Sequence, residues 1–132
     1  MKQVYSLGYA KYKDLPSFIR LLKDLEVDVL VDVRRFPRSR NPEFTAENLG
    51  CELPKNGMRY EFLGEALGGF RRGGYETYAE TAEYKEAIRR LLQMAEKDTV
   101  AIMCLEHKSK HCHRRFIMQT LSELGVEVVP VE

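Results

Sequence analysis

Apolar residues in this chain form two kinds of pattern, and the two alternate from one end to the other. Short runs typical of buried or half-buried strands occupy 4–7, 27–33, 58–63, 100–104 and 126–131. Between these runs, apolar residues recur every three or four positions, which predicts helices after Asp14, after Thr45, over 77–97 and over 116–124. This order predicts one α/β domain over 1–132, built on a mostly parallel, doubly wound, Rossmann-like sheet of about five strands with helices on both faces.

Residues that cap, break or turn the chain sharpen these boundaries. Asp14 and Thr45 can each accept hydrogen bonds from the free amides of a first helical turn, so both are expected helix caps. Gly125 is expected to end the last helix, and Pro130 suits an edge strand because it has no amide hydrogen to donate. The glycine-rich stretch 64–74 is expected to lack regular structure and to bring backbone amides close to a ligand.

One edge of such a sheet is expected to hold nearly all the reactive side chains. In parallel sheets the loops that leave the carboxyl ends of the strands lie together, and ligands bind there. These loops include 8–9, 32–34, 64–74 and 104–114. The last of them joins a buried strand to an amphipathic helix and contains cysteines, histidines, a glutamate, lysines and an arginine. We therefore expect the functional site at this edge.

Composition excludes several classes of protein. No apolar run approaches the length that spans a membrane, and the first residues lack the apolar segment of a signal peptide, so we expect a cytoplasmic protein without a membrane partner. The 21 basic and 20 acidic residues give a net charge of +1, which argues against a broad basic footprint for nucleic acid. Three cysteines without a scaffold-like spacing favour reduced thiols. The sequence carries no signal for an oligomeric state.

Three motifs give the chain a family resemblance. They are VDVRRFPRS at 31–39, LGEALGG at 63–69 and MCLEHKSKHCHRRFI at 103–117. With these motifs the chain resembles the domain of unknown function 488 family over nearly its whole length. The turn Gly8-Tyr9-Ala10 departs from the Gly-His-Ser that relatives often carry, so no histidine or serine role carries over there. The resemblance implies no established reaction, and function has to be argued from the site.

Cys112 is the first candidate for a catalytic residue. It lies near the expected start of a helix, between two histidines and beside Arg114, and helix amides and cations stabilise a thiolate. The alternative is a small residue that packs a strand-helix corner. Cys104 and Cys51 are most simply core residues, although a loop could bring Cys104 close enough to Cys112 for a redox couple.

Metal binding is the second possibility for this loop. Thiolate and imidazole are the preferred ligands of zinc, and the candidates are Cys104, His107, His111, Cys112 and His113. Their spacing matches neither a zinc finger nor a zinc ribbon. We therefore expect no metal and no other cofactor.

Two acidic residues are further candidates for catalysis. Asp32 is at the end of the second expected strand, and Glu106 lies just past the fourth. A carboxylate in such a place either pairs with an arginine for structure or takes part in proton transfer or nucleophilic attack. Arg34 and Arg114 are the obvious partners for pairing. Two carboxylates facing each other could instead divide acid and base roles, as in glycosyl transfer.

Cationic side chains at the same edge indicate a ligand with phosphate or carboxylate oxygens. Planar guanidinium groups bind such oxygens through paired hydrogen bonds, which explains several arginines at one edge better than unrelated surface charges. Tyr9, Phe70 and Tyr75 could stack on a base or pack within the protein. The expected ligand-binding residues are Arg34, Arg38, Ser39, Gly68, Gly69, Arg71, His113 and Arg114.

Two functions are consistent with these residues. The first is an enzyme that holds a small phosphorylated or nucleotide-like ligand and uses Glu106, Asp32 or Cys112 for group transfer or hydrolysis. The second is a noncatalytic module that binds nucleic acid or another phospho-ligand through the same arginines. The near-neutral net charge and the convergence of acids, thiols and arginines favour the enzyme.

Overall fold

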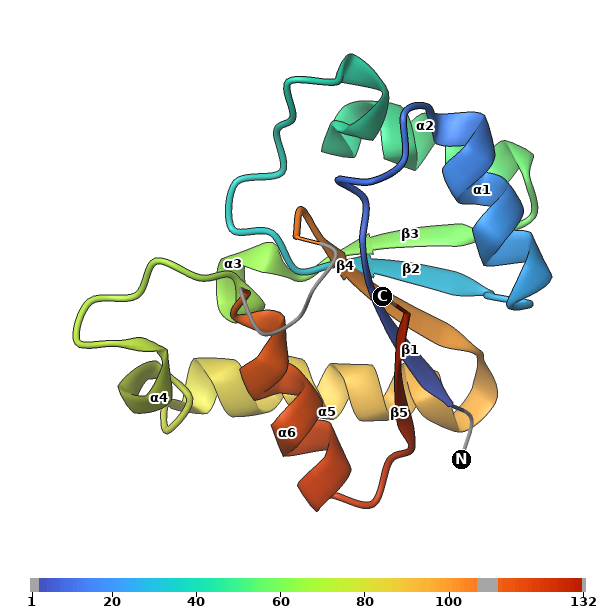
Figure 1. Ribbon diagram of the computed structural model, residues 1–132. Helices are drawn as coiled ribbons and strands as arrows, with labels where there is room; N and C mark the ends of the chain where they lie inside the picture. The colour runs from blue at the N-terminus through green and yellow to red at the C-terminus, as the bar shows by residue number, and fades with distance from the viewer. Residues whose placement is uncertain (1–2, 107–111, 132) are drawn as a thin grey trace.

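Five parallel strands form one sheet in the order β3-β2-β4-β1-β5 (Figure 1). The computed structural model describes residues 3–106 and 112–131. The strands are β1 (Val4–Gly8), β2 (Val29–Asp32), β3 (Arg59–Phe62), β4 (Val100–Cys104) and β5 (Val128–Val131). Within the sheet, β4 lies between β2 and β1, with Val100 in register with Val29 on one side and Val4 on the other. The prediction of a parallel α/β sheet is confirmed.

Helices cover both faces of this sheet. They are α1 (Leu15–Asp24), the 3-10 turn η1 (Pro42–Phe44), α2 (Ala46–Lys55), α3 (Gly64–Leu67), α4 (Tyr75–Tyr78), α5 (Ala82–Lys97) and α6 (Arg114–Glu123). In Figure 1, α1 and α2 lie above the sheet, and α5 and α6 lie below it. No helix among the described residues is long and apolar enough to cross a bilayer.

Two cores form because successive residues of a strand point to opposite faces. Leu30 and Met103 pack in the core beneath α1 and α2. Val31 and Ile102, their neighbours along the same strands, pack in the core with α5 and α6. The central strands β2 and β4 are buried along their full length, which explains why their sequences read as continuous apolar runs.

Side-chain caps set where the helices begin. Asp14 accepts a hydrogen bond from the Ser17 amide at 2.9 Å, and Thr45 accepts one from the Asn48 amide at 3.3 Å, so both predicted caps are confirmed. The helix predicted over 77–97 is confirmed over Ala82–Lys97 as α5, but its start is wrong, because a separate short helix, α4, comes before it. Thr81 is extended and caps α5, and this cap ends the preceding turn of helix.

The glycine-rich stretch also differs from its prediction in part. The first four residues of 64–74 form the helical turn α3, and the rest has no regular structure. Side chains from later in the chain satisfy the carbonyls of this short turn. Tyr75 donates to the Leu67 carbonyl at 2.6 Å and Tyr78 to the Ala66 carbonyl at 2.8 Å. Sequence spacing alone did not reveal these distant donors.

The end of the chain follows its pattern. Gly125 has a φ of +89° just after α6, a conformation that glycine adopts readily and that ends the helix. The following strand β5 is at the edge of the sheet. Pro130 is tolerated there because an edge strand does not need every amide hydrogen for strand pairing. Both predictions are confirmed.

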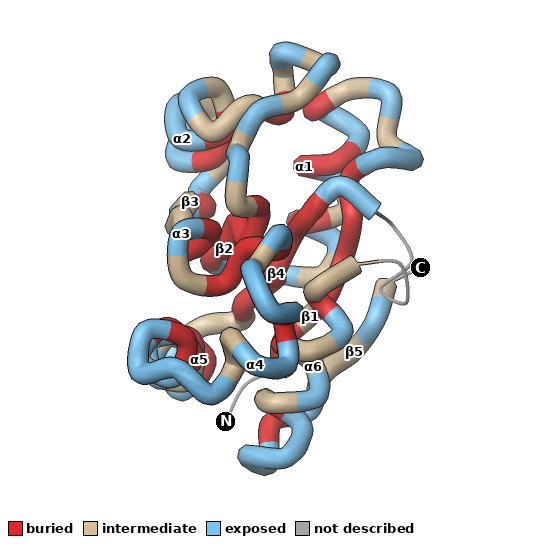
Figure 2. The backbone as a smooth tube through the Cα atoms, turned by 90° about the vertical axis from the view of Figure 1, so that its left-hand side faces the viewer, coloured by how far each residue is buried: buried red, intermediate tan, exposed pale blue. Residues whose placement is uncertain are grey.

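The connections of β2 and β4 diverge. The chain leaves β2 through α2 toward β3 on one face, whereas it leaves β4 through α6 toward β5 on the other face. Where neighbouring strands diverge in this way, their carboxyl ends form a crevice suited to a ligand. Figure 2, turned toward this edge, shows the buried ends of β1, β2 and β4 among more exposed loops.

Candidate active site

A pocket of about 440 Å³ occupies this crevice. Loops that follow β1, β2 and β4 line it together with the residues that lead into α6. The lining residues are Tyr9, Arg34, Arg35, Phe36, Arg38, Gly69, Phe70, Cys104, Leu105, Glu106, Cys112 and His113. The expected edge therefore does gather a thiol, an acid and several arginines into one hollow.

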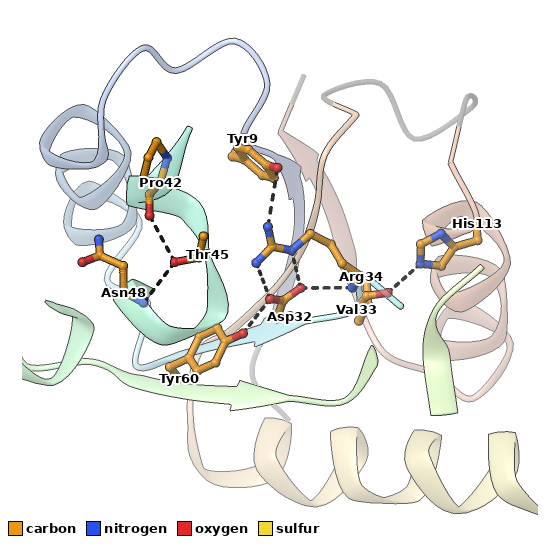
Figure 3. Close-up of polar contacts among 9 residues, drawn as sticks. All are labelled: Tyr9, Asp32, Val33, Arg34, Pro42, Thr45, Asn48, Tyr60 and His113. Carbon is orange, nitrogen blue, oxygen red and sulfur yellow. Dashed lines mark hydrogen bonds and ion pairs between the residues drawn. The ribbon is translucent and has the colours of Figure 1, made fainter. Parts of the chain in front are cut away.

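The Asp32 carboxylate lies beside the pocket and accepts four hydrogen bonds. Its carboxylate accepts hydrogen bonds from the Arg34 backbone amide at 3.0 Å, from Arg34 Nε at 2.9 Å and from Arg34 Nη2 at 2.6 Å. The Tyr60 hydroxyl of β3 donates a fourth at 2.6 Å (Figure 3). Asp32 is fully buried. Of the two roles considered for this acid, the geometry favours structural pairing.

The same contacts shift the pKa values of both partners. Burial would lower the pKa of Arg34, but the hydrogen bonds and negative charge of Asp32 more than offset this, so the pKa lies above its ordinary value. Burial and the neighbouring Asp32 charge raise the pKa of Tyr60 far above its ordinary range. Arg34 therefore stays charged and Tyr60 stays a hydrogen-bond donor. The Arg34 guanidinium also lies 5.3 Å from the Tyr9 ring.

Arg114 is buried rather than exposed to a ligand. Its guanidinium Nη1 donates to the Leu7 carbonyl, to the Glu106 carbonyl at 2.7 Å and to Cys104 Sγ at 3.4 Å. Arg114 thus ties the carboxyl ends of β1 and β4 to the start of α6. It supplies positive charge beside a cysteine sulfur, and it is not among the residues that line the pocket.

The structure pairs the sulfurs of Cys104 and Cys112. This pairing fits the redox couple considered from the sequence better than isolated reduced thiols, because the end of β4 and the start of α6 lie side by side. Their separation of eight residues gave no standard dithiol motif, yet the fold brings the sulfurs together. Cys51 was expected in the core but is exposed on α2 as a free cysteine, because it lies on the outer side of that helix.

His113 lies against Cys112 in a defined tautomer. Its Nε2 is 2.8 Å from the Val33 carbonyl, which can only accept, so Nε2 carries the hydrogen (Figure 3). Nδ1 then has a free lone pair and lies 3.5 Å from Cys112 Sγ. The Arg114 backbone amide donates to the same sulfur at 3.5 Å.

The electrostatic environment keeps this imidazole neutral. Burial lowers the pKa of His113; the hydrogen bond to Val33 opposes that change, and the charges of Arg114 and Arg71 add to it. A neutral imidazole at pH 7 can accept a proton from a neighbouring thiol. When Cys112 is reduced, its thiol hydrogen therefore faces a suitable base.

Two of the predicted ligand-binding residues, Ser39 and Arg71, have structural roles near the pocket. Arg71 donates to the Gly68 carbonyl at 2.9 Å and stacks on Tyr78, which places it in a structural role outside the pocket. The Ser39 hydroxyl accepts from the Asn41 amide at 3.1 Å and turns the loop. Neither side chain lines the pocket.

Two glycines allow the loop after β3 to approach the site closely. A Cβ at Gly68 would collide with the backbone of Arg35. At Gly69 it would lie 3.2 Å from His113 Nδ1, the atom that faces Cys112. These predicted positions therefore support the pocket through close packing.

The mouth of the pocket combines cations with exposed aromatic rings. Arg38 is exposed, and its guanidinium has no hydrogen bond or ion pair with any residue that the structure describes. Phe36 is 53% exposed and Phe70 85% exposed, with ring centroids 6.1 Å apart. Arg35 holds this pair in place through a 2.7 Å hydrogen bond to the Phe70 carbonyl.

Glu106 is exposed beside this mouth. Its carboxylate has no partner within residues 3–106 and 112–131, and it lines the pocket. Tyr9 is buried and stacks on Phe44 at 4.6 Å, while Tyr75 is buried and stacks on Phe116 at 5.1 Å. Of the three aromatic residues considered for base stacking, Phe70 alone is exposed.

The structure describes three of the five candidate metal ligands, Cys104, Cys112 and His113. Of the five candidate ligands, His107 and His111 lie outside the described residues. Within the described ranges, no group of three or more histidines, cysteines and acids is placed to hold a metal ion.

Comparison with protein-family models gives one match. Residues 14–121 match the model described as domain of unknown function DUF488. The chain belongs to the DUF488 family. A comparison with curated proteins found no match. The DUF488 match includes β2, β4 and most of α6, so it covers most of the pocket, whereas Tyr9 lies before it.

Several residues in or beside the pocket were not identified from the sequence. Tyr60 lies on β3 and reaches Asp32 across the sheet, a contact that only the register of β2 and β3 could reveal. Arg35 and Phe36 sit between two predicted ligand residues in the RRFPR run. Leu105, 49% exposed beside Glu106, also lines the pocket, and nothing in its sequence context distinguished it from the end of the buried strand.

Proposed function

We propose that this pocket is the active site of an enzyme that acts on a phosphorylated or nucleotide-like ligand, with Cys112 as the nucleophile. The observation that carries the proposal is the contact between Cys112 Sγ and the unprotonated Nδ1 of His113. A nucleophile beside a base, with the base oriented by a third group, is the usual arrangement for covalent catalysis. Here the third group is the Val33 carbonyl.

The first step requires the reduced form of Cys112. The thiol proton moves to His113 Nδ1, and the Arg114 amide at the start of α6 stabilises the thiolate. The sulfur then forms a bond to the electrophilic atom of the ligand. The leaving group departs with the proton that His113 took from the thiol. Water or a second acceptor then attacks the ligand atom bonded to sulfur, gives its proton to His113 and releases the Cys112 thiolate.

The arginines have different roles in this proposal. Arg34 is neutralised by Asp32, so the uncompensated positive charge comes from Arg35 and Arg38. Their guanidinium groups suit the oxygens of a phosphate or carboxylate. Asp32 acts as a positioning residue, because its oxygens already accept hydrogen bonds from Arg34 and Tyr60.

The test uses the reduced protein and a panel of nucleotides and phosphoesters. We expect Cys112→Ser to abolish turnover, and we expect Cys51→Ser, at the exposed cysteine on α2, to leave it unchanged. Mass spectrometry of the quenched reaction should show the ligand fragment attached at Cys112. Turnover that survives in Cys112→Ser would reject the thiol mechanism, and Glu106→Gln would then test the acid.

A noncatalytic module is the second candidate, and the pocket mouth favours it. Arg38 and the exposed rings of Phe36 and Phe70 resemble the combination of cation and stacking surface that holds single-stranded nucleic acid. Affinity for an oligonucleotide would then fall steeply with salt, because phosphate contacts release counterions. Tight, salt-dependent binding without turnover of any panel member would favour the module.

A further inference from the structure

The two sulfurs at the pocket have unequal surroundings. Cys104 is 3% exposed at the end of β4, and Arg114 donates to its sulfur. Cys112 is half-buried at the start of α6; both cysteines line the pocket, so the difference between them is in exposure. His113 and the Arg114 amide contact the Cys112 sulfur. One cysteine can therefore meet a ligand, while the other can mainly meet its partner sulfur.

We propose that Cys104 and Cys112 form a thiol–disulfide exchange centre for small anionic disulfides, in which Cys112 attacks and Cys104 resolves. The pairing of their sulfurs shows that the two cysteines can meet, as the oxidised end state of that reaction requires. The inference rests on the proposed function only for the assignment of Cys112 as nucleophile. It adds an activity and assigns a role to Cys104.

The reaction balances without any other oxidant. The Cys112 thiolate attacks one sulfur of a substrate disulfide, forms a mixed disulfide and releases the first substrate thiolate. The Cys104 thiolate then attacks Cys112 Sγ, which breaks the mixed disulfide and releases the second thiolate. The protein dithiol loses two electrons and two protons, and the substrate gains them as two thiols. A small dithiol returns the protein to its reduced state.

The environment of each sulfur suits its step. An attacking thiol needs a raised thiolate fraction, which the base and the helix amide supply to Cys112. Arg114 beside Cys104 favours the thiolate of the resolving cysteine in the same way. Because Cys104 is buried, a bulky disulfide cannot reach it first.

The charge of the pocket predicts which disulfides react fastest. Among the described residues, Arg35 and Arg38 line the mouth with one opposing acid, Glu106. Exposed apolar side chains lie beside them at Phe36, Phe70 and Leu105. An anionic disulfide with aromatic or apolar groups fits this lining better than a cationic one.

The experiment compares three disulfide probes on the reduced protein carrying Cys51→Ser. The probes are anionic dithiobis(nitrobenzoate), neutral bis(hydroxyethyl) disulfide and cationic cystamine. Because these probes also differ in intrinsic reactivity, each rate is divided by that of the probe with a small free thiol. We expect the normalised rate to be at least about tenfold higher for the anionic probe than for cystamine at low salt, and the ratio to shrink at high salt.

The resolving step is read by mass spectrometry. The background protein should end with a Cys104–Cys112 bond and release both probe thiols, whereas Cys104→Ser should stop at the mixed disulfide on Cys112 with one thiol released. Cys104→Ala repeats the test without an added hydroxyl. Two results would overturn the inference. One is a mixed disulfide that persists in the protein carrying Cys51→Ser alone, and the other is a normalised rate that does not depend on probe charge. Exchange without turnover of any phosphoester would reject the proposed group transfer alone, and turnover without exchange would reject this inference alone.

Discussion

Two hollows on this molecule differ in a way that size does not explain. The groove between α1 and α2 has a volume of about 550 Å³, against about 440 Å³ for the pocket at the carboxyl edge. The groove has balanced charges, since Arg20 and Lys23 line it with Glu43 and Glu52, and among the described residues neither a cysteine nor a histidine lines it. The described lining of the pocket gathers a cysteine pair, a histidine, Glu106 and three arginines, of which Arg34 is already paired with Asp32.

The difference follows from how each hollow is made. Two consecutive helices, both in the first half of the chain, form the groove, and their outward-facing side chains are those of ordinary solvated surfaces. The pocket is formed by loops that the crossover connections bring together from residues 9 to 113. In a parallel sheet, topology rather than volume determines where reactive groups meet.

The largest expected effect is a loss of unfolding free energy when the buried pair of Asp32 and Arg34 is broken. Asp32→Ala would leave the Arg34 guanidinium, 6% exposed, without its buried partner and would remove an acceptor from Tyr60. Breaking a buried pair from one side typically costs about 3–5 kcal/mol of unfolding free energy. Urea unfolding should show a loss of this size.

An exposed pair on α5 supplies the matched control. Glu86 and Arg89 are both 56% exposed, so solvent screens their ion pair and it adds little to stability. Glu86→Gln should therefore change the urea midpoint only slightly. Equal losses in the two variants would show that the Asp32 network does not support the pocket.

The contrast between Asp14 and Asp32 shows what the sequence could reveal. Asp14 acts on an amide three residues away, so its role as a helix cap depends on local geometry and could be predicted. Asp32 has a local partner in Arg34, but its other partner, Tyr60, arrives through the pairing of β2 with β3. The alternation of elements predicted the edge, whereas side-chain partners across the sheet required the register.

Arg114 and the cysteines show the same limit. Arg114 follows Cys112 in the sequence and was expected to meet a ligand, yet the start of α6 directs it inward to the end of β1. The pairing of Cys104 with Cys112 depends on how closely the end of β4 approaches the start of α6, which spacing does not determine. Cys51 was misplaced because it lies in an amphipathic helix whose apolar face is defined by other residues, Leu49 and Leu53.

The next largest effect concerns the reactivity of Cys112. In the reduced protein, His113→Asn should lower the rate of alkylation of Cys112 by about tenfold at pH 7, since general bases contribute at least that much. Glu52→Gln in the groove should leave the rate unchanged. Alkylation followed by peptide mass spectrometry gives the rate at this one cysteine. An unchanged rate in His113→Asn would mean that the imidazole does not act on the thiol.

A smaller effect should follow from charge at the pocket mouth. Arg38→Gln should slow the reaction of Cys112 with iodoacetate, an anion, by about threefold at low salt while leaving the rate with neutral iodoacetamide nearly unchanged. Arg20→Gln removes the same charge from the groove and is the matched control. A similar slowing in both variants would attribute the effect to net charge rather than to the pocket.

The smallest effect is a dependence of stability on pH that separates the two hollows. The pKa of His113 is lowered from its ordinary 6.5 by burial, with Arg114 and Arg71 adding to the shift. The unfolded chain therefore binds a proton at a higher pH than the folded chain does. Stability should fall as pH drops from about 7 through 6.5 toward the folded pKa, and then level off for this group.

The variant His113→Asn removes the imidazole and so isolates its contribution to the pH dependence of the unfolding free energy. The difference in unfolding free energy between the wild type and His113→Asn should shrink over that interval, because the wild type alone loses the stability linked to the neutral imidazole. Tyr75 and Cys112 also face the ring, and neither carries charge near pH 6 in the disulfide form. Glu52→Gln in the groove should retain the full wild-type slope near pH 6. A parallel pair of curves for the wild type and His113→Asn would mean that the imidazole titrates as it does in the unfolded chain, and the pocket would then lack the low-polarity surroundings that distinguish it from the groove.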